Sequence, residues 1–232
     1  MSESPKAVIL LSGGIDSSTT LAIARDMGFK CYALSFRYGQ NNYIEIESAK
    51  KMADRLGAAE HIVLDIDLSV FGGSALTGTG EIPKDRKENE IFGGDIPVSY
   101  VPARNTVFLS LGLAWAETID AHDIFIGVNS LDYSGYPDCR EEFIRSFENT
   151  ANLGTKQGAE GHPYKIHTPL VNLTKAEIID RGNRLGVDYS ITISCYDPDD
   201  KGRSCGRCDS CLLRKKGFRD AGIEDPTEYV SG

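Results

Sequence analysis

The feature that most constrains the fold is an apolar run that stops at two glycines and several small hydroxyl residues. The chain reads Val8-Ile9-Leu10-Leu11-Ser12-Gly13-Gly14-Ile15-Asp16-Ser17-Ser18, and a helical apolar pattern begins soon afterwards. The run is too short for a typical helix, so it predicts a buried strand, a tight turn and a helix start. Glycines let the turn bring backbone N–H groups close to an anion, and a helix N-terminus attracts phosphate. We expect Asp16 or Ser17 to cap this helix.

This turn lacks the patterns of two common phosphate-binding loops. No Lys-Ser or Lys-Thr pair follows the glycines, and the Gly-x-Gly-x-x-Gly spacing is absent. The remaining pattern, Ser-Gly-Gly-x-Asp-Ser after a first strand, resembles the PP-loop family of ATP enzymes. In that family the loop holds the β- and γ-phosphates while the α-phosphate passes to a substrate oxygen. The resemblance implies adenylation chemistry and an ATP site formed by Leu11, Ser12, Gly13, Gly14, Ile15, Asp16, Ser17 and Ser18. For two glycines alone, a turn without a ligand would be the better interpretation.

Length and charge narrow the class of protein. The 232 residues fit one α/β domain with an appendage. With 25 basic and 34 acidic residues the chain is net acidic, which disfavours a broad nucleic-acid footprint. Residues 1–6 are polar, without a signal peptide's apolar core, and no run is long enough to span a bilayer. We therefore expect a cytoplasmic protein with no nucleic-acid or membrane partner.

Strands that alternate with helices predict a doubly wound, mainly parallel sheet with helices on both faces. Further strands are expected at 30–36, 61–65 and 124–128, a short edge segment at 166–170, and helices at 44–56, 106–121, 141–151 and 174–185. Thr174 and Glu177 form a capping box at the start of the last of these helices. The PP-loop resemblance implies the adenine nucleotide alpha hydrolase-like fold for residues 1–188, with residues 189–232 as a small C-terminal subdomain.

Two polar segments stand where ligands of open α/β sheets bind. Tyr38 and Gln40 directly follow the second predicted strand. Arg104 and Asn105 precede the longest helical run, and Asn105 can cap it. Arg104 would then lie at a helix N-terminus, where the dipole disfavours a cation, so an anionic ligand is one interpretation and a surface arginine the other.

The loop after the fourth predicted strand is dense in groups that could recognise a flat polar ring. Tyr133 and Tyr136 offer faces for stacking. Asp132 and Asp138 can accept hydrogen bonds from a guanine-like N–H edge, and Arg140 is a donor fork for a carboxylate. The alternative is an ordinary polar turn.

Residues 67–101 lack a clear periodic pattern and are punctuated by glycines. A segment this long without regular structure is usually functional or disordered. We expect it to act as a lid over bound ligand.

Four of the six cysteines crowd near the C-terminus, at positions 195, 205, 208 and 211. Two overlapping Cys-x-x-Cys steps and a fourth cysteine can close a tetrahedral thiolate site for Zn²⁺. With sulfur at every position no water is left to activate, so the metal held by Cys195, Cys205, Cys208 and Cys211 is expected to be structural. An iron–sulfur cluster is the alternative, because four cysteines suit it equally well.

Together these motifs resemble the 7-cyano-7-deazaguanine (preQ0) synthase family, the QueC family of PP-loop enzymes. The segments that carry the resemblance are Leu11–Ser17, Phe36-x-Tyr38-Gly39-Gln40, Val101-Pro102-x-Arg104-Asn105, Asp132–Arg140 and the four-cysteine tail. The family converts 7-carboxy-7-deazaguanine to the nitrile in queuosine biosynthesis. The resemblance therefore implies an ATP-dependent C–N ligase that works through an adenylated acid and an activated amide.

The resemblance also implies roles for single residues. Asp16, Ser17 and Arg104 would be catalytic, with Mg²⁺ near Asp16. The purine-like carboxylate substrate would be bound by Tyr38, Gln40, Arg104, Asn105, Asp132, Tyr133, Tyr136, Asp138 and Arg140. No glutaminase domain fits in this length, so free ammonium is the expected nitrogen donor. The family tends to be homodimeric, and we expect the same here.

Three other interpretations stay open. A tRNA-modifying PP-loop enzyme would usually show a basic RNA-binding appendage or a catalytic cysteine pair. A non-catalytic nucleotide- or partner-binding protein could use the cysteine tail as an interaction module. Some defence-system proteins also look like deazaguanine synthases, and they act on protein termini.

Overall fold

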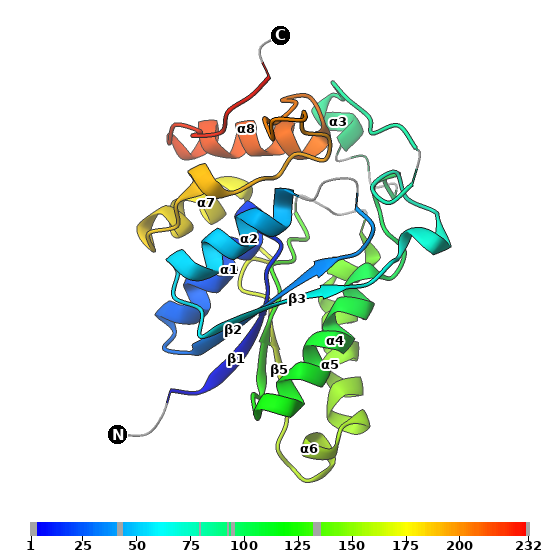
Figure 1. Ribbon diagram of the computed structural model, residues 1–232, viewed down its shortest axis with the longest axis vertical. Coiled ribbons are helices and arrows are strands. Elements are labelled where there is room, and N and C mark those ends of the chain that lie inside the picture. The colour runs from blue at the N-terminus through cyan, green and yellow to red at the C-terminus, as the bar shows by residue number, and fades with distance from the viewer. Residues whose placement is uncertain are drawn as a thin grey trace.

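The five strands of the computed structural model form one parallel sheet in the order β3-β2-β1-β4-β5 (Figure 1). The structure describes residues 4–40, 44–78, 80–91, 93, 96–131 and 136–230. The strands are β1 (Lys6–Leu10), β2 (Lys30–Arg37), β3 (Glu60–Asp65), β4 (Asp123–Phe125) and β5 (Lys165–His167). The strand order reverses between β1 and β4, and at such a switch point the carboxyl ends of the strands leave a crevice for a ligand.

Helices cover both faces of this sheet (Figure 1). On one side lie α1 (Ile15–Asp26), α2 (Ile44–Arg55) and α7 (Lys175–Arg184); on the other lie α4 (Arg104–Ile119) and α5 (Glu141–Gly154). The remaining elements are η1 (Ser69–Phe71), α3 (Glu88–Ile91), η2 (Pro137–Cys139), α6 (Lys156–Ala159), η3 (Tyr189–Ile191) and α8 (Asp209–Ala221). The predicted fold class, a doubly wound parallel sheet with a C-terminal four-cysteine segment, is confirmed.

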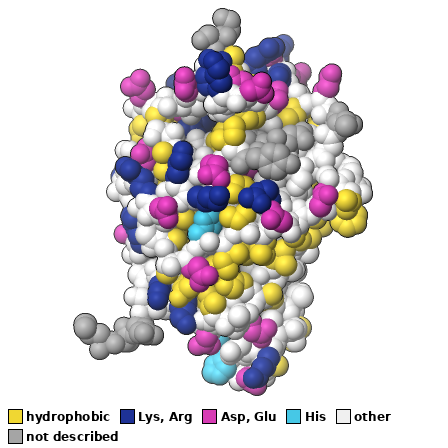
Figure 2. Space-filling model, viewed as in Figure 1, with side chains coloured by type: hydrophobic (Ala, Val, Ile, Leu, Met, Phe, Trp, Pro, Cys, Tyr) yellow, Lys and Arg dark blue, Asp and Glu magenta, His cyan; other side chains and the backbone are white. Residues whose placement is uncertain are grey.

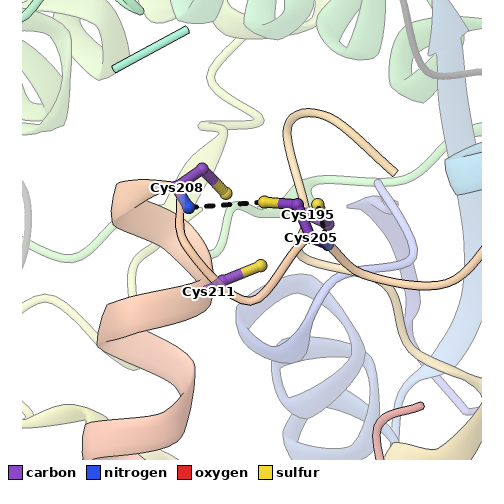
Figure 3. Close-up of side chains that lie close together, drawn as sticks. All are labelled: Cys195, Cys205, Cys208 and Cys211. Carbon is purple, nitrogen blue, oxygen red and sulfur yellow. Dashed lines mark hydrogen bonds between the residues drawn. The ribbon is translucent and has the colours of Figure 1, made fainter. Parts of the chain in front are cut away.

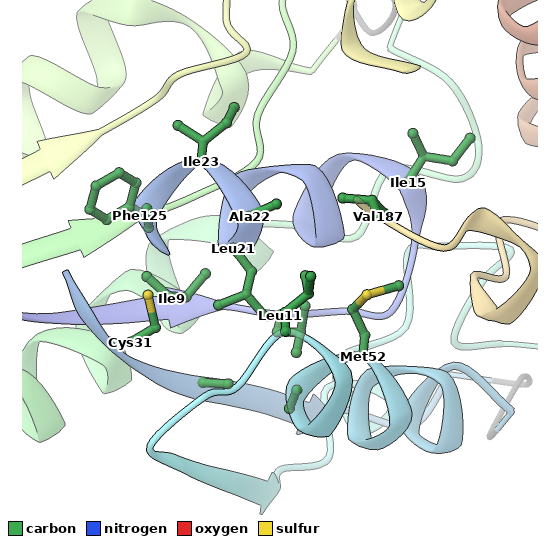
Figure 4. Packing of buried hydrophobic residues seen from close by; sticks show 14 of the residues in the cluster. Ile9, Leu11, Ile15, Leu21, Ala22, Ile23, Cys31, Met52, Phe125 and Val187 are labelled. Atoms are coloured by element: carbon green, nitrogen blue, oxygen red, sulfur yellow. The ribbon is translucent and has the colours of Figure 1, made fainter. Parts of the chain in front are cut away.

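The first strand explains why its sequence is apolar without alternation. Ile9 and Leu11 face the core under α1, together with Leu21 and Met52 (Figure 4). Val8 and Leu10 face the opposite core, under α4 and α5. A strand buried on both faces needs apolar residues at every position, and each fully buried Leu or Ile stabilises the fold by roughly 1.5–3 kcal/mol. The central strand therefore holds the turn that follows it firmly in place.

The predicted capping box is confirmed, whereas the predicted N-caps of α1 and α4 are wrong. Thr174 accepts a hydrogen bond from the Glu177 N–H, and the Glu177 carboxylate accepts one from Thr174 in return. The N-cap of α1 is Gly14, so Asp16 and Ser17 lie inside its first turn. The N-cap of α4 is Ala103, in the left-handed conformation at φ 53°, so Asn105 is also inside the helix. A distant side chain, described below, takes over the capping of α4.

The C-terminal segment, residues 189–230, packs on the rest of the fold through α8, which lies beside α7 (Figure 1). Its anchor is Arg214, whose side chain is only 1% exposed. The guanidinium donates to Asp225 at 3.0 Å, to the Thr192 hydroxyl at 2.8 Å and to the Tyr189 carbonyl at 3.0 Å. Each of the three guanidinium nitrogens thus donates a hydrogen bond within the segment, which fixes α8 against η3.

Each helix in the described ranges is either too short or too polar to cross a membrane.

Candidate active site

A cavity of about 230 Å³ opens at the carboxyl ends of β1, β2 and β4. Its lining comes from the glycine turn after β1, the segment after β2, the first turns of α2 and α4, and the segment after β4. Ser194 and Tyr196 of the C-terminal segment and Leu76 from residues 67–101 complete the wall. The predicted ligand-binding segments after β1 and β2 and before α4 therefore meet in one place.

The glycine turn is held between two other parts of the chain. Gly13 has φ +85°, and a Cβ there would lie 2.5 Å from the Glu45 carbonyl oxygen of α2. Its own carbonyl accepts a hydrogen bond of 3.1 Å from the Ile193 N–H of the C-terminal segment. Only glycine can adopt this conformation without strain at such a close approach. Inside the turn, the hydroxyls of Ser12 and Ser17 lie 3.0 Å apart.

An ion pair that sequence analysis missed lies at the mouth of this turn. The Lys175 ammonium donates to both oxygens of Asp16, at 2.6 and 2.8 Å, and the lysine side chain is only 9% exposed. Lys175 begins α7, and a Cβ at Gly217 of α8 would lie 2.3 Å from its Cγ, so the absence of a side chain there makes room for the lysine stem. A cation at a helix N-terminus is unfavourable. The same signal that singled out Arg104 could have found Lys175.

Another part of the cavity lining brings together a cation, a phenol and a carboxyl group: Arg104, Tyr38 and Glu45. Arg104 lies over the Tyr38 ring at 5.9 Å from its centroid. Burial raises the pKa of the Tyr38 hydroxyl, and the Arg104 charge opposes the shift. Burial also raises the pKa of Glu45 to about 7, again against the pull of Arg104. Behind them Phe36 and Phe108 stack with ring centroids 4.0 Å apart, forming a flat apolar surface.

Two residues predicted to bind substrate use their polar atoms locally. The Gln40 side chain lines the cavity, but it accepts from the Tyr38 N–H at 2.7 Å and donates to the Phe36 carbonyl at 3.3 Å. Asn105 also lines the cavity, and its amide donates to the Asp138 carbonyl at 3.1 Å. Both side chains therefore line the cavity and also hold the neighbouring backbone in place through hydrogen bonds.

The loop after β4 caps the N-terminus of α4. Asp138 accepts a hydrogen bond of 3.1 Å from the Asn105 N–H and so satisfies an amide at the helix N-terminus. Asp138 and Arg140 are not among the described residues that line the cavity, and Arg140 is exposed. Tyr136 does line it, and its hydroxyl lies 2.9 Å from that of Ser99. Asp132 and Tyr133, also predicted to bind substrate, lie outside the described residues.

Within the predicted ATP site, the cavity lining includes Leu11, Ser12, Gly14, Ile15, Asp16 and Ser17. Gly13 and Ser18 are not in that lining, and Ser18 is fully buried in α1. Cys139 lines the cavity as well, but burial raises the pKa of its thiol to about 12, which disfavours a nucleophilic thiolate.

The four cysteines near the C-terminus converge on one point (Figure 3). Their sulfur atoms all lie within 4.8 Å of one another, and three of the four residues are buried. Backbone N–H groups of Asp197 and Cys205 donate to the Cys195 sulfur at 3.3 and 3.2 Å. Hydrogen bonds from neighbouring thiols lower the pKa of Cys208 far below its usual range. Compact sulfur donors with N–H groups directed at them fit a metal such as zinc.

Residues 84–86, within the segment predicted to form a lid, are attached to the four-cysteine cluster. The Asp85 N–H donates to the Arg207 carbonyl at 2.8 Å, and the two side chains form an ion pair. Lys84 pairs with Asp197 at 2.6 Å, and Arg86 pairs with Asp209 at 2.8 Å. The turn that carries Cys205 and Cys208 is thus joined to the segment that supplies Leu76 to the cavity wall. Closure of the segment over a ligand stays a prediction.

Comparison with known proteins adds a family to this geometry. The family model described as "Queuosine biosynthesis protein QueC" matches residues 6–222, a span that includes both the glycine turn and the four cysteines. Three relatives are each named 7-cyano-7-deazaguanine synthase. The protein from Desulfatibacillum aliphaticivorans is 61% identical over 226 residues, 97% of each chain. That from Citrifermentans bemidjiense is 62% identical over 224 residues, again 97% of each chain. That from an Azoarcus species is 58% identical over 230 residues, 99% of each chain.

Proposed function

The chain belongs to the QueC family of queuosine biosynthesis proteins, and from this premise we propose that it converts 7-carboxy-7-deazaguanine and ammonia to 7-cyano-7-deazaguanine with ATP. The observation that carries the proposal is one cavity with two differently equipped ends. The Asp16–Lys175 pair and the serine hydroxyls stand at one end, and Arg104 with its aromatic neighbours stands at the other.

The reaction explains why both ends are needed. A carboxylate is a poor electrophile because its charge repels a nucleophile and oxide is a poor leaving group. Transfer of AMP from ATP gives an acyl adenylate, and pyrophosphate departs toward residues 12–17. Lys175, paired with Asp16 at this turn, would help to neutralise phosphate charge in a partly dry site. Asp16 would hold Mg²⁺, which supplies further neutralisation when it is bound.

The other end suits the acid. Arg104 offers a donor fork for the carboxylate or for the α-phosphate that joins it. Phe36 and Phe108 give a flat surface on which a heterocycle can lie. Ammonia then forms the amide, and a second activation of the amide oxygen allows its loss and leaves the nitrile.

We propose a structural role for the four-cysteine cluster. Cys195, Cys205, Cys208 and Cys211 would hold Zn²⁺ with no position left for water. The ion supplies folding energy to the C-terminal segment, which borders the cavity through Ser194 and Tyr196. We also propose that the chain divides into an ATP-binding part, residues 1–188, and a zinc-binding part, residues 189–232. We propose as well that the protein is a homodimer.

The test is incubation of the full chain with ATP, Mg²⁺, ammonium and 7-carboxy-7-deazaguanine, followed by product mass. We expect a nitrile product, and an adenylated acid when ammonium is left out and the reaction is quenched rapidly. ATP consumption without the acid-derived products would contradict the proposal. Salt-dependent retention of tRNA would instead favour a tRNA-modifying enzyme, although basic and acidic side chains are interspersed on the face shown in Figure 2.

A further inference from the structure

The lining of the cavity holds a second carboxylate whose role the scheme above leaves open. Among the described residues that line it, the acidic side chains are Asp16 and Glu45. Asp16 is bound at both oxygens by Lys175. Glu45 makes no side-chain hydrogen bond to another described residue, and the charge that acts on its pKa is that of Arg104. A carboxylate in a ligand cavity without a structural partner is available for chemistry.

The backbone fixes Glu45 relative to the glycine turn. Glu45 lies in the first turn of α2, and its carbonyl oxygen is 2.5 Å from the position that a Cβ on Gly13 would occupy. The glycine turn and the first turn of α2 therefore lie in close contact. Arg104 reaches the same region from the start of α4, with Tyr38 between the two segments. The proposed carboxylate-binding group and Glu45 consequently face one part of the cavity.

Amide formation needs a proton acceptor at that part of the cavity. At neutral pH the nitrogen donor is mostly ammonium, which has no lone pair for attack. After attack, the nitrogen carries one more hydrogen than the neutral amide. A positioned carboxylate can take both protons in turn if its pKa is near the pH of the medium. The pKa of Glu45, raised to about 7 by burial, meets this condition.

We propose that Glu45 is the general base for the attacking nitrogen, an inference that rests on the proposed function. Ammonium gives one proton to the Glu45 carboxylate and becomes ammonia. The ammonia lone pair forms the C–N bond, the C–O bond to phosphate breaks, and its electron pair leaves with AMP. Glu45 passes its first proton to solvent, accepts the second from the new C–N nitrogen, and the neutral amide remains.

The experiment separates adenylation from amide formation in Glu45→Gln. Acid-dependent exchange of labelled pyrophosphate into ATP reports adenylation alone, and product mass reports the amide and nitrile. We expect exchange within about threefold of the parent and amide formation reduced by roughly 10²–10⁴-fold, the usual contribution of a general base. Hydroxylamine, which is mostly neutral at pH 7, should react with the adenylate in Glu45→Gln nearly as fast as in the parent. Glu47→Gln is the matched control, because Glu47 lies on the same helix with its side chain 62% exposed.

The outcomes distinguish the two proposals. Parent protein without acid-dependent exchange overturns the proposed function and the role of Glu45 with it. Normal exchange in the parent but none in Glu45→Gln overturns the role of Glu45 as general base and leaves the proposed function standing. Glu45 would then be needed for adenylation or for folding. Equal loss with ammonium and with hydroxylamine also overturns the base. Glu45→Asp, which keeps a carboxylate, should recover part of the ammonium reaction, and recovery no better than in Glu45→Gln contradicts the proposal.

Discussion

The two sides of the cavity are built in opposite ways. The side that we propose for phosphate, the phosphate side, is mainly a continuous strand, turn and helix, so residues close together in the sequence form most of it and Lys175 is the exception. The side made by the C-terminal segment joins residues far apart in the chain, such as Asp85 with Arg207, and it depends on four cysteines. Changes on the phosphate side should therefore alter turnover while the fold persists. Changes on the cysteine side should alter stability first and turnover as a consequence.

The largest expected effect is on the cysteine side. Cys208→Ser removes one of the four proposed zinc ligands, and structural zinc contributes on the order of 10 kcal/mol in small zinc domains. We expect metal content to fall and the melting temperature to drop by roughly 10 °C or more. Metal analysis and calorimetry measure this, with Cys31→Ala, a buried thiol outside the cluster, as the control. Full metal content and unchanged melting in Cys208→Ser would show that the cluster does not hold this side together.

Asp16→Ala tests the phosphate side. We expect nitrile formation to fall by roughly 10³-fold or more, because the proposed holder of the metal and phosphate charge is lost. The fold should persist, since Asp16 lines a cavity and water can solvate the Lys175 ammonium that it leaves. Steady-state turnover and circular dichroism are the measurements, and Asp65→Ala, an exposed residue at the end of β3, is the control. Turnover near the parent rate would remove Asp16 from the mechanism.

Lys175→Met tests the phosphate side through the second member of the Asp16–Lys175 ion pair. The change keeps the length of the apolar stem beside Gly217 and removes the ammonium. We expect turnover to fall by roughly 10²–10³-fold, the range for loss of one positioned group that stabilises transition-state charge. Lys50→Met, on an exposed part of α2, should leave turnover unchanged. If ATP exchange in Lys175→Met equals that of the parent, Lys175 takes no part in adenylation, either directly or by positioning Asp16.

Local patterns in the sequence were sufficient for features formed by residues close together in the chain, and insufficient for contacts between distant residues. The glycine turn, the Thr174 capping box and the cysteine spacing each depend on residues within a few positions of one another or on a metal that gathers them. Lys175 was missed because its partner Asp16 is 159 positions away. Asp138 was predicted to bind substrate, and that stays a prediction; its hydrogen bond from the Asn105 N–H at the start of α4 could not be read from the loop alone. The chemical type of a residue was readable, and its partner was not.

The pH dependence of stability offers a smaller effect with a definite sign. Burial raises the pKa of Glu45 from 4.5 to about 7, so the folded protein binds a proton there that the unfolded chain releases. The stability that this gives is fully present below pH 4.5 and is lost as pH rises through 7. Glu45→Gln cannot lose a proton, so its denaturant midpoint should rise relative to the parent between pH 5 and pH 8. A difference between the two proteins that stays constant over this range would mean that Glu45 is solvated in the fold.

The smallest expected effect concerns the exposed ion pair between Asp85 and Arg207 on the cysteine side. Asp85→Lys places a second cation beside Arg207, and Asp85→Lys combined with Arg207→Asp restores opposite charges. Exposed pairs are screened by solvent, so global melting should barely change in either variant. The repulsion would strain the backbone hydrogen bond between residues 85 and 207. Protease sensitivity of residues 80–91 should therefore rise in the single variant and return to the parent level in the double variant. Equal protease sensitivity in all three proteins would show that the backbone and the cysteine cluster hold this wall without help from surface charge.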